Sequence, residues 1–207
     1  MNCDLVLVGL NHRTAGVDVR ERFALVNHCS ADSWAVPCEG AISEAMILST
    51  CNRVELLAAG HGDMAEQMLT DWAHTCKASV EDLRPYVYIY KGVEAVRHLF
   101  TVASSLDSMV LGEPQILGQL KTAYRKAAAC HTTGLILNRL LHKAFSVAKR
   151  VRTETAVASS AVSISYAAVE LAKRIFGDMP SHRAMLLGAG EMAELAATHL
   201  LQAGIAE

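Results

Sequence analysis

The fold is decided by the stretch Ala45-Met-Ile-Leu48-Ser-Thr50-Cys51-Asn52-Arg53-Val54-Glu-Leu-Leu-Ala-Ala59. Two apolar runs, at 45–48 and 54–59, have the length and composition of buried strands. The polar break between them spans only residues 50–53. A break this short favours an antiparallel hairpin, so the two runs are predicted to pair with each other.

The segments on either side of this hairpin extend it to a complete domain. An apolar run at 5–10 predicts a strand, and residues 17–26 follow it as a short helix. After the hairpin, apolar residues recur at helical spacing over 64–77, and residues 87–90 predict a fourth strand. The resulting order is β-α-β-β-α-β, which is typical of the ferredoxin-like split βαβ arrangement.

From residue 93 onward the pattern becomes helical. Helices are predicted over 93–103, 115–130 and 135–152, with a break at Leu111-Gly112-Glu113-Pro114. A further helix, capped by Ser159 or Ser160, ends near Phe176-Gly177, and residues 184–187 predict a strand. We therefore expect an α+β chain. Its first domain is a catalytic domain over 1–155 with a helical C-terminal part. A linker helix and the first βα unit of an incomplete Rossmann-type domain follow over 156–207.

Composition indicates an ordinary globular protein. The chain has 207 residues, of which 52% are hydrophobic and 19% are charged, with a formal net charge of −2. It has no signal sequence and no apolar stretch of the roughly 18 residues that a membrane helix needs, which predicts a cytoplasmic location. None of the six cysteines forms a C-x-x-C pair, so no zinc site is predicted and most should be free thiols.

Cys51 is the first candidate for chemistry. It stands at a strand end, two residues before the cation of Arg53, and a nearby cation favours the nucleophilic thiolate. The residues alone leave a simple surface turn open as the alternative.

A second candidate site is the turn Gly188-Ala189-Gly190-Glu191-Met192-Ala193, which follows a predicted strand and opens a helix. This is the G-x-G-x-x-G/A context that binds a dinucleotide pyrophosphate, because the small residues allow a tight turn and close backbone approach. An ordinary βα turn is the alternative. The residue that would select NAD or NADP lies about 20 positions further on, beyond Glu207.

The third feature is electrostatic. The interval between Glu113 and Glu154 contains no acidic residue, and its basic side chains are Lys121, Arg125, Lys126, Arg139, Lys143, Lys149, Arg150 and Arg152. A basic amphipathic helix binds phosphates, although it is also compatible with a plain solvated face. A thiolate, a dinucleotide turn and a basic helix together suggest reduction of an acyl group through a thioester, with the acyl group delivered on RNA.

These residues resemble a known family, the glutamyl-tRNA reductases, over essentially the whole chain. The resemblance is carried by four motifs, which are Gly9-Leu-Asn-His12-Arg-Thr14-Ala15, Leu48-Ser-Thr50-Cys51-Asn52-Arg53-Val-Glu55, Ala103-Ser-Ser-Leu106-Asp107-Ser108-Met-Val-Leu111-Gly112-Glu113-Pro114-Gln115-Ile116-Leu117-Gly118-Gln119, and Gly188-Ala-Gly190-Glu191-Met192. The third motif is long and highly specific.

The resemblance implies NADPH-dependent reduction of glutamyl-tRNA to glutamate-1-semialdehyde, the first step of the five-carbon route to tetrapyrroles. Cys51 would form the thioester, and His98 would act near the reacting centre. Substrate-contacting positions would be Thr50, Asn52, Arg53, Ser108, Glu113, Pro114, Gln115 and Gln119. Of these, Arg53 suits a substrate carboxylate because its fork binds in bidentate fashion. The turn Gly188, Ala189, Gly190, Glu191, Met192 and Ala193 would bind NADPH. A homodimer is implied for full-length members, through a domain beyond Glu207.

Several departures and alternatives remain. Gly16 stands where the family usually has proline, Ser105 where it usually has glycine, and Ala193 where it usually has the third glycine. Without the resemblance, His98 is read as a helix-surface histidine, Ser108 as a helix cap, and Gln115 and Gln119 as solvent-facing. The competing functions are a truncated, non-reducing glutamyl-tRNA-binding or esterase module and another cysteine-dependent dehydrogenase acting on a free aldehyde.

Overall fold

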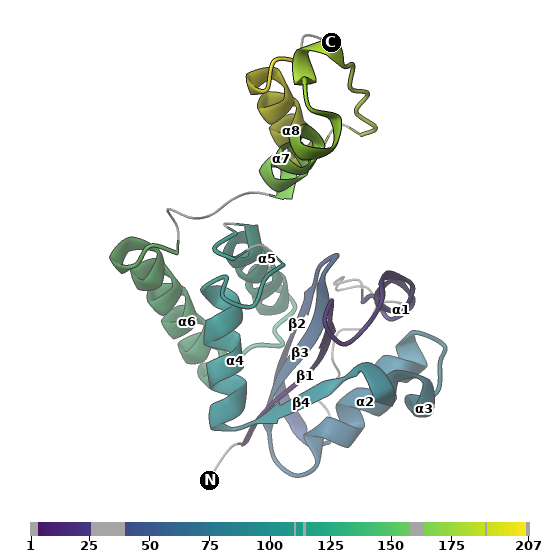
Figure 1. Cartoon of the computed structure of the whole chain (residues 1–207). Coiled ribbons are helices and arrows are strands. Elements are labelled where there is room, and N and C mark those ends of the chain that lie inside the picture. Colours follow the sequence, from purple (N-terminus) through teal and green to yellow (C-terminus); the bar gives the residue numbers. More distant parts are fainter. Residues whose placement is uncertain are drawn as a thin grey trace.

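The computed structural model describes residues 4–25, 40–109, 111–113, 115–157, 164–188 and 190–205. Its first part is a four-stranded sheet with helices on both faces (Figure 1). The elements in chain order are β1 (Asp4–Asn11), α1 (Val17–Arg22), β2 (Ile42–Ser49), β3 (Arg53–Gly60), α2 (Met64–Thr75), α3 (Val80–Leu83), β4 (Tyr88–Lys91), α4 (Val93–Ala103), α5 (Gln115–Ala129), α6 (Leu135–Glu154), α7 (Ile164–Phe176) and α8 (Glu191–Gln202).

The sheet has the strand order β2-β3-β1-β4, and each neighbouring pair is antiparallel. Ser49 pairs with Val54 in the β2–β3 hairpin, and residues 50–52 connect the two strands. Both the hairpin and the ferredoxin-like βαββαβ order are therefore confirmed.

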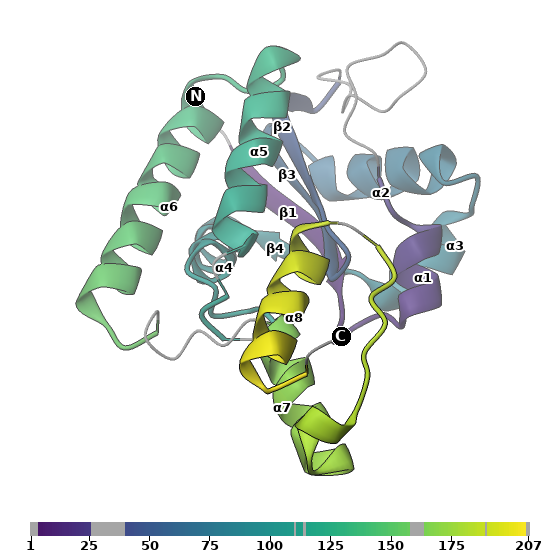
Figure 2. The same cartoon turned by 90° about the horizontal axis from the view of Figure 1, so that it is seen from above.

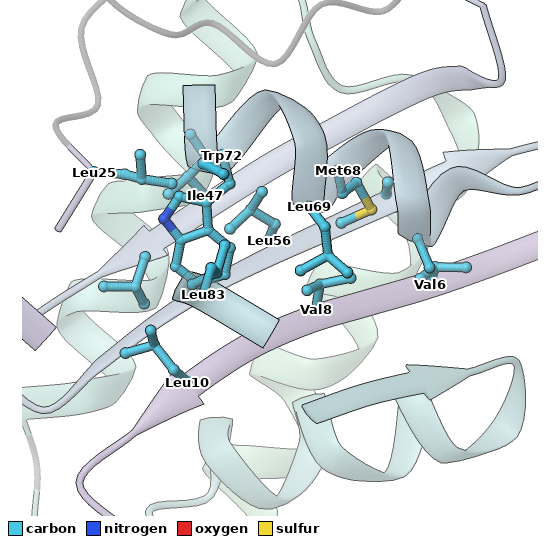
Figure 3. Packing of buried hydrophobic residues seen from close by; sticks show 14 of the residues in the cluster. Val6, Val8, Leu10, Leu25, Ile47, Leu56, Met68, Leu69, Trp72 and Leu83 are labelled. Atoms are coloured by element: carbon cyan, nitrogen blue, oxygen red, sulfur yellow. The ribbon is translucent and has the colours of Figure 1, made fainter. Parts of the chain in front are cut away.

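One face of the sheet packs against α2, as Figure 3 shows. Val8, Leu56 and Ile47 point from three strands toward the fully buried Trp72 and Leu69 of α2. The indole nitrogen of Trp72 donates to the backbone carbonyl of Phe23 at 3.0 Å, so this polar atom is satisfied inside the core.

The other face is covered by α4, α5 and α6 (Figures 1 and 2). Leu57 and Ala59 of β3 belong to this second core, whereas Val54 and Leu56 belong to the first. Because strand side chains alternate between faces, Arg53 and Glu55 also point toward the helices of the second face. All eight residues of β3 are buried, which explains why residues 56–60 are apolar without alternation.

The C-terminal part consists of α7 packed against α8, with Val169, Met179 and Ile205 buried between its segments. The strand predicted over residues 184–187 is not formed, and Met185 and Leu187 are 81% and 87% exposed. A strand needs backbone hydrogen bonds from a neighbour, and the described residues supply none at this position. Gly188 and Gly190 nevertheless lead into a helix as predicted.

Two local differences from the sequence prediction have simple causes. Helix α1 ends at Arg22 rather than near residue 26, because Phe23 and Leu25 turn into the core. Helix α3 was not predicted, although Ser79 caps it by accepting a hydrogen bond from the Asp82 amide at 3.2 Å.

The proposed caps Ser159 and Ser160 lie outside the described residues. No helix in the described ranges is both long and apolar enough to cross a membrane.

The N-terminus of α6 is capped by a carboxylate from another element. The buried Glu44 of β2 accepts backbone hydrogen bonds from Gly134, Ile136 and Leu137 at 2.9, 3.0 and 2.7 Å. A negative charge at this end of a helix also interacts favourably with the helix dipole. A Cβ atom at Gly134 would lie 2.6 Å from the Glu44 carboxylate, so the close approach requires glycine.

Replacing Glu44 with alanine is expected to lower the free energy of unfolding by about 2–3 kcal/mol, because three amides lose a charged acceptor. Urea denaturation monitored by circular dichroism measures the change. The exposed neighbour Ser43 provides the control, and Ser43→Ala should leave the midpoint nearly unchanged. Equal effects of the two substitutions would contradict the capping role.

Candidate active site

Cys51 lies at the tip of the β2–β3 turn, and its side chain is exposed. The turn is organised by Thr50, whose hydroxyl oxygen accepts hydrogen bonds from the Asn52 and Arg53 amides at 3.2 and 3.1 Å. The Thr50 amide in turn donates to the Arg53 carbonyl at 2.8 Å. Side-chain bonds of this kind hold a tight turn without glycine, so the cysteine has a defined position.

Two further contacts attach this turn to the segment after β1. The His12 amide donates to the Asn52 carbonyl at 2.9 Å. The Arg20 guanidinium donates to the Cys51 carbonyl at 3.1 Å and to the Ala15 carbonyl at 2.6 Å. The backbone around Cys51 is thus held by the segment after β1 while its thiol stays accessible.

A pocket of about 240 Å³ opens beside the thiol. It is lined by Thr50, Cys51, Asn52, Arg53, Ser108, Met109, Glu113, Gln115, Ile116 and Gln119. All the predicted substrate positions within the described residues therefore meet at one cavity, although they come from the β2–β3 turn, from the loop between α4 and α5 and from the start of α5. Pro114, the remaining predicted position, lies outside the described residues.

Arg53 lines this pocket but is 2% exposed, and its guanidinium is paired within the protein. One of its terminal nitrogens donates to Glu55 at 2.8 Å and to the Asp107 carboxylate at 3.2 Å, and the other donates to the Asp107 backbone carbonyl. The cation that the sequence places near the thiol is thus shared by two carboxylates, Glu55 and Asp107.

Glu55 is the centre of the buried polar network. Its Oε1 atom accepts hydrogen bonds from Arg53 at 2.8 Å and from the Tyr88 hydroxyl at 2.5 Å. The same atom lies 2.7 Å from His98 Nε2. Burial alone would raise the pKa of Glu55, but the hydrogen bond from His98 and the charge of Arg53 outweigh it and lower the pKa below its ordinary value. Glu55 is therefore an anion in the interior.

His98 belongs to the buried polar network beside the pocket, through its contact with Glu55. It is neither a free surface histidine nor part of the pocket lining, since its side chain is 12% exposed and contacts Glu55. Its ring also lies 4.8 Å from the Tyr90 ring and 5.2 Å from the Tyr88 ring, measured between centroids. Within the described residues, His98 is connected to the pocket through Glu55 and Arg53.

The two ends of the Gly9–Ala15 motif serve this network and the turn beside it. A Cβ atom at Gly9 would lie 2.8 Å from Glu55 and 2.9 Å from Tyr88, so only glycine allows both side chains to cross β1. At the other end, Arg13 forms an ion pair with Asp107 at 3.0 Å. Its neighbour His12 has a pKa lowered by burial and by the nearby arginines, so its neutral form is favoured.

The long motif around residue 105 contains a strained residue. Ser105 has a φ of +62°, in the region that favours glycine, and it stands where the family usually has glycine. Its hydroxyl compensates by donating to the Glu113 carbonyl at 2.6 Å, while its own carbonyl accepts from the Gly112 amide at 2.9 Å. These bonds shape the loop that brings Ser108 and Glu113 to the pocket. Burial raises the pKa of Glu113 above its ordinary value.

The predicted dinucleotide turn lies at the start of α8. Gly188 has a φ of +115°, and no atom lies within 4 Å of a Cβ placed at Gly188 or Gly190. Gly190 is the N-cap of α8 without a side-chain cap, and the Ala193 amide bonds to its carbonyl at 2.9 Å. This open helix N-terminus fits a pyrophosphate group. Ala189 lies outside the described residues, as do the side chains of Glu191 and Met192.

Sequence reasoning assigned no role to Glu55, Asp107, Tyr88 or Arg20. A signal for Glu55 was available, because residues two apart on a strand share a face and Arg53 precedes it by two. Asp107 and Tyr88 reach Arg53 and Glu55 only through tertiary packing, so no local pattern marks them.

Comparison with known proteins agrees with these motifs. A profile of the family described as "Glutamyl-tRNAGlu reductase, N-terminal domain" matches residues 8–155, and one described as "Shikimate / quinate 5-dehydrogenase" matches residues 170–207. The chain is 80% identical to a glutamyl-tRNA reductase of Desulfovibrio desulfuricans and 68% identical to one of Nitratidesulfovibrio vulgaris. Both alignments cover 100% of this chain, and 48% and 47% of the relatives.

The solved structure of the glutamyl-tRNA reductase from Methanopyrus kandleri is also similar, with a TM-score of 0.68 and 37% identity over 98% of this chain and 47% of that one. The chain thus spans about half the length of the relatives it matches. Its sequence, its fold and the profile match over residues 8–155 lead to the same conclusion, that the chain belongs to the glutamyl-tRNA reductase family.

Proposed function

We propose that the complete protein reduces glutamyl-tRNA to glutamate-1-semialdehyde with NADPH, through a thioester on Cys51. The observation that carries this proposal is the exposed Cys51 thiol beside a pocket lined by polar side chains from two separate motifs. A nucleophile held in a fixed turn next to a polar cavity is the arrangement that covalent acyl transfer requires.

The first step is transfer of the acyl group. The Cys51 sulfur, as thiolate, attacks the carbonyl carbon of the aminoacyl ester and forms a C–S bond. The C–O bond to the terminal ribose then breaks, and the released tRNA hydroxyl takes up a proton. During this exchange Arg20 holds the Cys51 carbonyl and Thr50 holds the amides of Asn52 and Arg53, so the turn keeps its position.

The second step needs a hydride, which is the chemistry that NADPH supplies when bound. Gly188, Gly190 and the first turn of α8 are the residues of this chain proposed to hold its pyrophosphate, with Ala189, Glu191 and Met192 completing the motif. His98 is proposed to act at the reacting centre through Glu55 and Arg53, because these contacts are its connection to the pocket.

Substrate recognition is proposed to involve the lining residues Asn52, Ser108, Gln115 and Gln119, together with Thr50, Glu113 and Pro114. Arg53 is the proposed partner of the substrate side-chain carboxylate. A carboxylate entering the pocket would meet a guanidinium already shared by Glu55 and Asp107, so it would have to displace or extend these contacts. The proposal for the complete protein also includes a homodimer, from the family resemblance, and a cytoplasmic location, from the composition of the sequence.

The experiment is a product assay of the complete protein with labelled glutamyl-tRNA and NADPH. We expect semialdehyde from glutamyl-tRNA and much less from glutaminyl-tRNA, because the amide lacks the charge that Arg53 would bind. Release of free glutamate without semialdehyde would instead support the alternative of a non-reducing esterase module. Oxidation of a free aldehyde with NADP+, without reduction of the tRNA ester, would support the other dehydrogenase class.

A further inference from the structure

A basic surface lies next to the pocket on the helices of the second sheet face. The acid-free interval between Glu113 and Glu154 folds into α5 and α6. We define the α5–α6 basic face by five exposed side chains, Lys121, Arg125, Arg139, Lys143 and Lys149. The protein as a whole has a formal charge of −2, so this face differs in sign from the average surface.

The cations point outward because both helices bury the opposite side. Helix α6 buries Leu137, Leu141, Ala144 and Ala148, and α5 buries Ile116, Leu120, Ala123 and Ala127. Both sets follow the spacing of three and four residues that defines one helical stripe. Lys121 and Arg125 are one turn apart on α5, and Arg139 and Lys143 are one turn apart on α6.

The outward sides of the two helices form one continuous surface. Helices α5 and α6 lie side by side over the sheet in Figure 2. The Tyr124 hydroxyl and His142 Nε2 are 3.2 Å apart, and the Lys121 ammonium lies 5.9 Å from the centre of the Phe145 ring. These contacts fix Lys121 at the seam and show that the helices run antiparallel, so Lys149 returns toward the start of α5.

The charges of this face are not compensated within the described residues. Arg150 pairs with Glu154 at 2.9 Å, but none of the five defining side chains forms an ion pair there. Elsewhere in the described chain, exposed arginines such as Arg22, Arg84 and Arg97 do have carboxylate partners. The basic face is therefore available to an external polyanion.

We propose that the α5–α6 basic face binds the phosphate backbone of the tRNA whose aminoacyl end enters the Cys51 pocket. The proposal rests on the proposed function, and it adds where the nucleic acid lies. Helix α5 connects the two sites, because Gln115 and Gln119 line the pocket and Lys121 follows within the same helix. Lys121 lies six positions after Gln115, which is about 9 Å along the helix axis. A polyanion attached to the reacting ester would therefore reach these cations.

The test measures binding of unacylated tRNA by the complete protein as a function of salt. The triple variant Lys121→Gln, Arg139→Gln, Lys143→Gln is compared with the control triple Lys77→Gln, Lys91→Gln, Arg97→Gln, which removes the same charge from exposed positions elsewhere. Each lost phosphate contact should reduce the slope of log K against log salt by about 0.7–0.9, so the first triple should lose about two units of slope. The control should keep the slope of the unmodified protein.

The same variants separate this proposal from the proposed reaction. We expect the first triple to raise KM for glutamyl-tRNA about tenfold or more at low salt with kcat unchanged, because uniform binding is lost and chemistry is not. Equal salt slopes and equal KM values for the two triples would overturn the basic face as the tRNA site. If the unmodified protein binds tRNA but does not cleave the ester, the proposed reaction fails, and the binding slopes still decide the location.

Discussion

Cys51→Ser is expected to reduce semialdehyde formation by about 10³-fold or more, because the hydroxyl of serine is a far weaker nucleophile than a thiolate. The turn should remain intact, since Thr50, Arg20 and His12 hold it through backbone atoms of residues 51–53. Binding of tRNA should therefore be unchanged. The measurement is single-turnover conversion of labelled glutamyl-tRNA by the complete protein with NADPH.

The matched control is Cys76→Ser, the other free cysteine in the described part of the chain. Burial raises the pKa of the Cys76 thiol, which keeps it protonated and poorly nucleophilic. This variant should retain most of its activity. If Cys76→Ser lost activity and Cys51→Ser kept it, the nucleophile would have been assigned to the wrong residue.

Glu55→Gln is expected to lower the free energy of unfolding by about 3–5 kcal/mol, because it removes one partner of a buried ion pair and leaves Arg53 undercompensated. The Oε1 charge that is lost has three polar neighbours, Arg53, Tyr88 and His98. Urea denaturation of the variant and the unmodified protein measures the loss. The exposed pair of Glu66 with Arg84 offers the control, and Glu66→Gln should leave the midpoint almost unchanged.

The pH dependence of stability gives a second readout for Glu55. Its pKa in the folded protein is lowered, so its contribution is present above the ordinary carboxyl pKa and is lost as pH falls through the lowered value. The free energy of unfolding of Glu55→Gln should therefore fall less steeply with decreasing pH than that of the unmodified protein. An unchanged stability profile in the variant would contradict the account of Glu55 as a buried anion.

The sheet was predictable because its strands carry local signals. The runs at 45–48 and 54–59, with a four-residue break, already specify the β2–β3 hairpin, and helical spacing through Met64, Met68 and Trp72 specifies α2. The basic interval was likewise visible as a charge pattern before its helices were placed. The prediction of a strand at 184–187 was wrong. Its residues have the apolar composition of a strand, but a strand also needs a neighbouring strand to bond with, and a local pattern cannot show whether one is present.

The candidate site was predictable in membership but not in arrangement. Motif matching selected Ser108, Gln115 and Gln119, and the pocket brings them to Cys51. The pairing of Arg53 with Asp107, 54 residues later, depends on how the loop after α4 folds over β3, and no pattern in the sequence shows this. The same holds for Gly9, whose small size becomes necessary only when Glu55 and Tyr88 cross above it.

The central claim is that an acyl group is transferred to Cys51, and the most direct test is to isolate that intermediate. The complete protein would be mixed with labelled glutamyl-tRNA in the absence of NADPH, quenched in acid and digested for mass spectrometry. The account predicts one glutamyl group on the peptide that contains Cys51, labile to hydroxylamine as a thioester is, and absent in Cys51→Ser. Semialdehyde formed on adding NADPH without any such adduct, or an adduct on another cysteine, would contradict it.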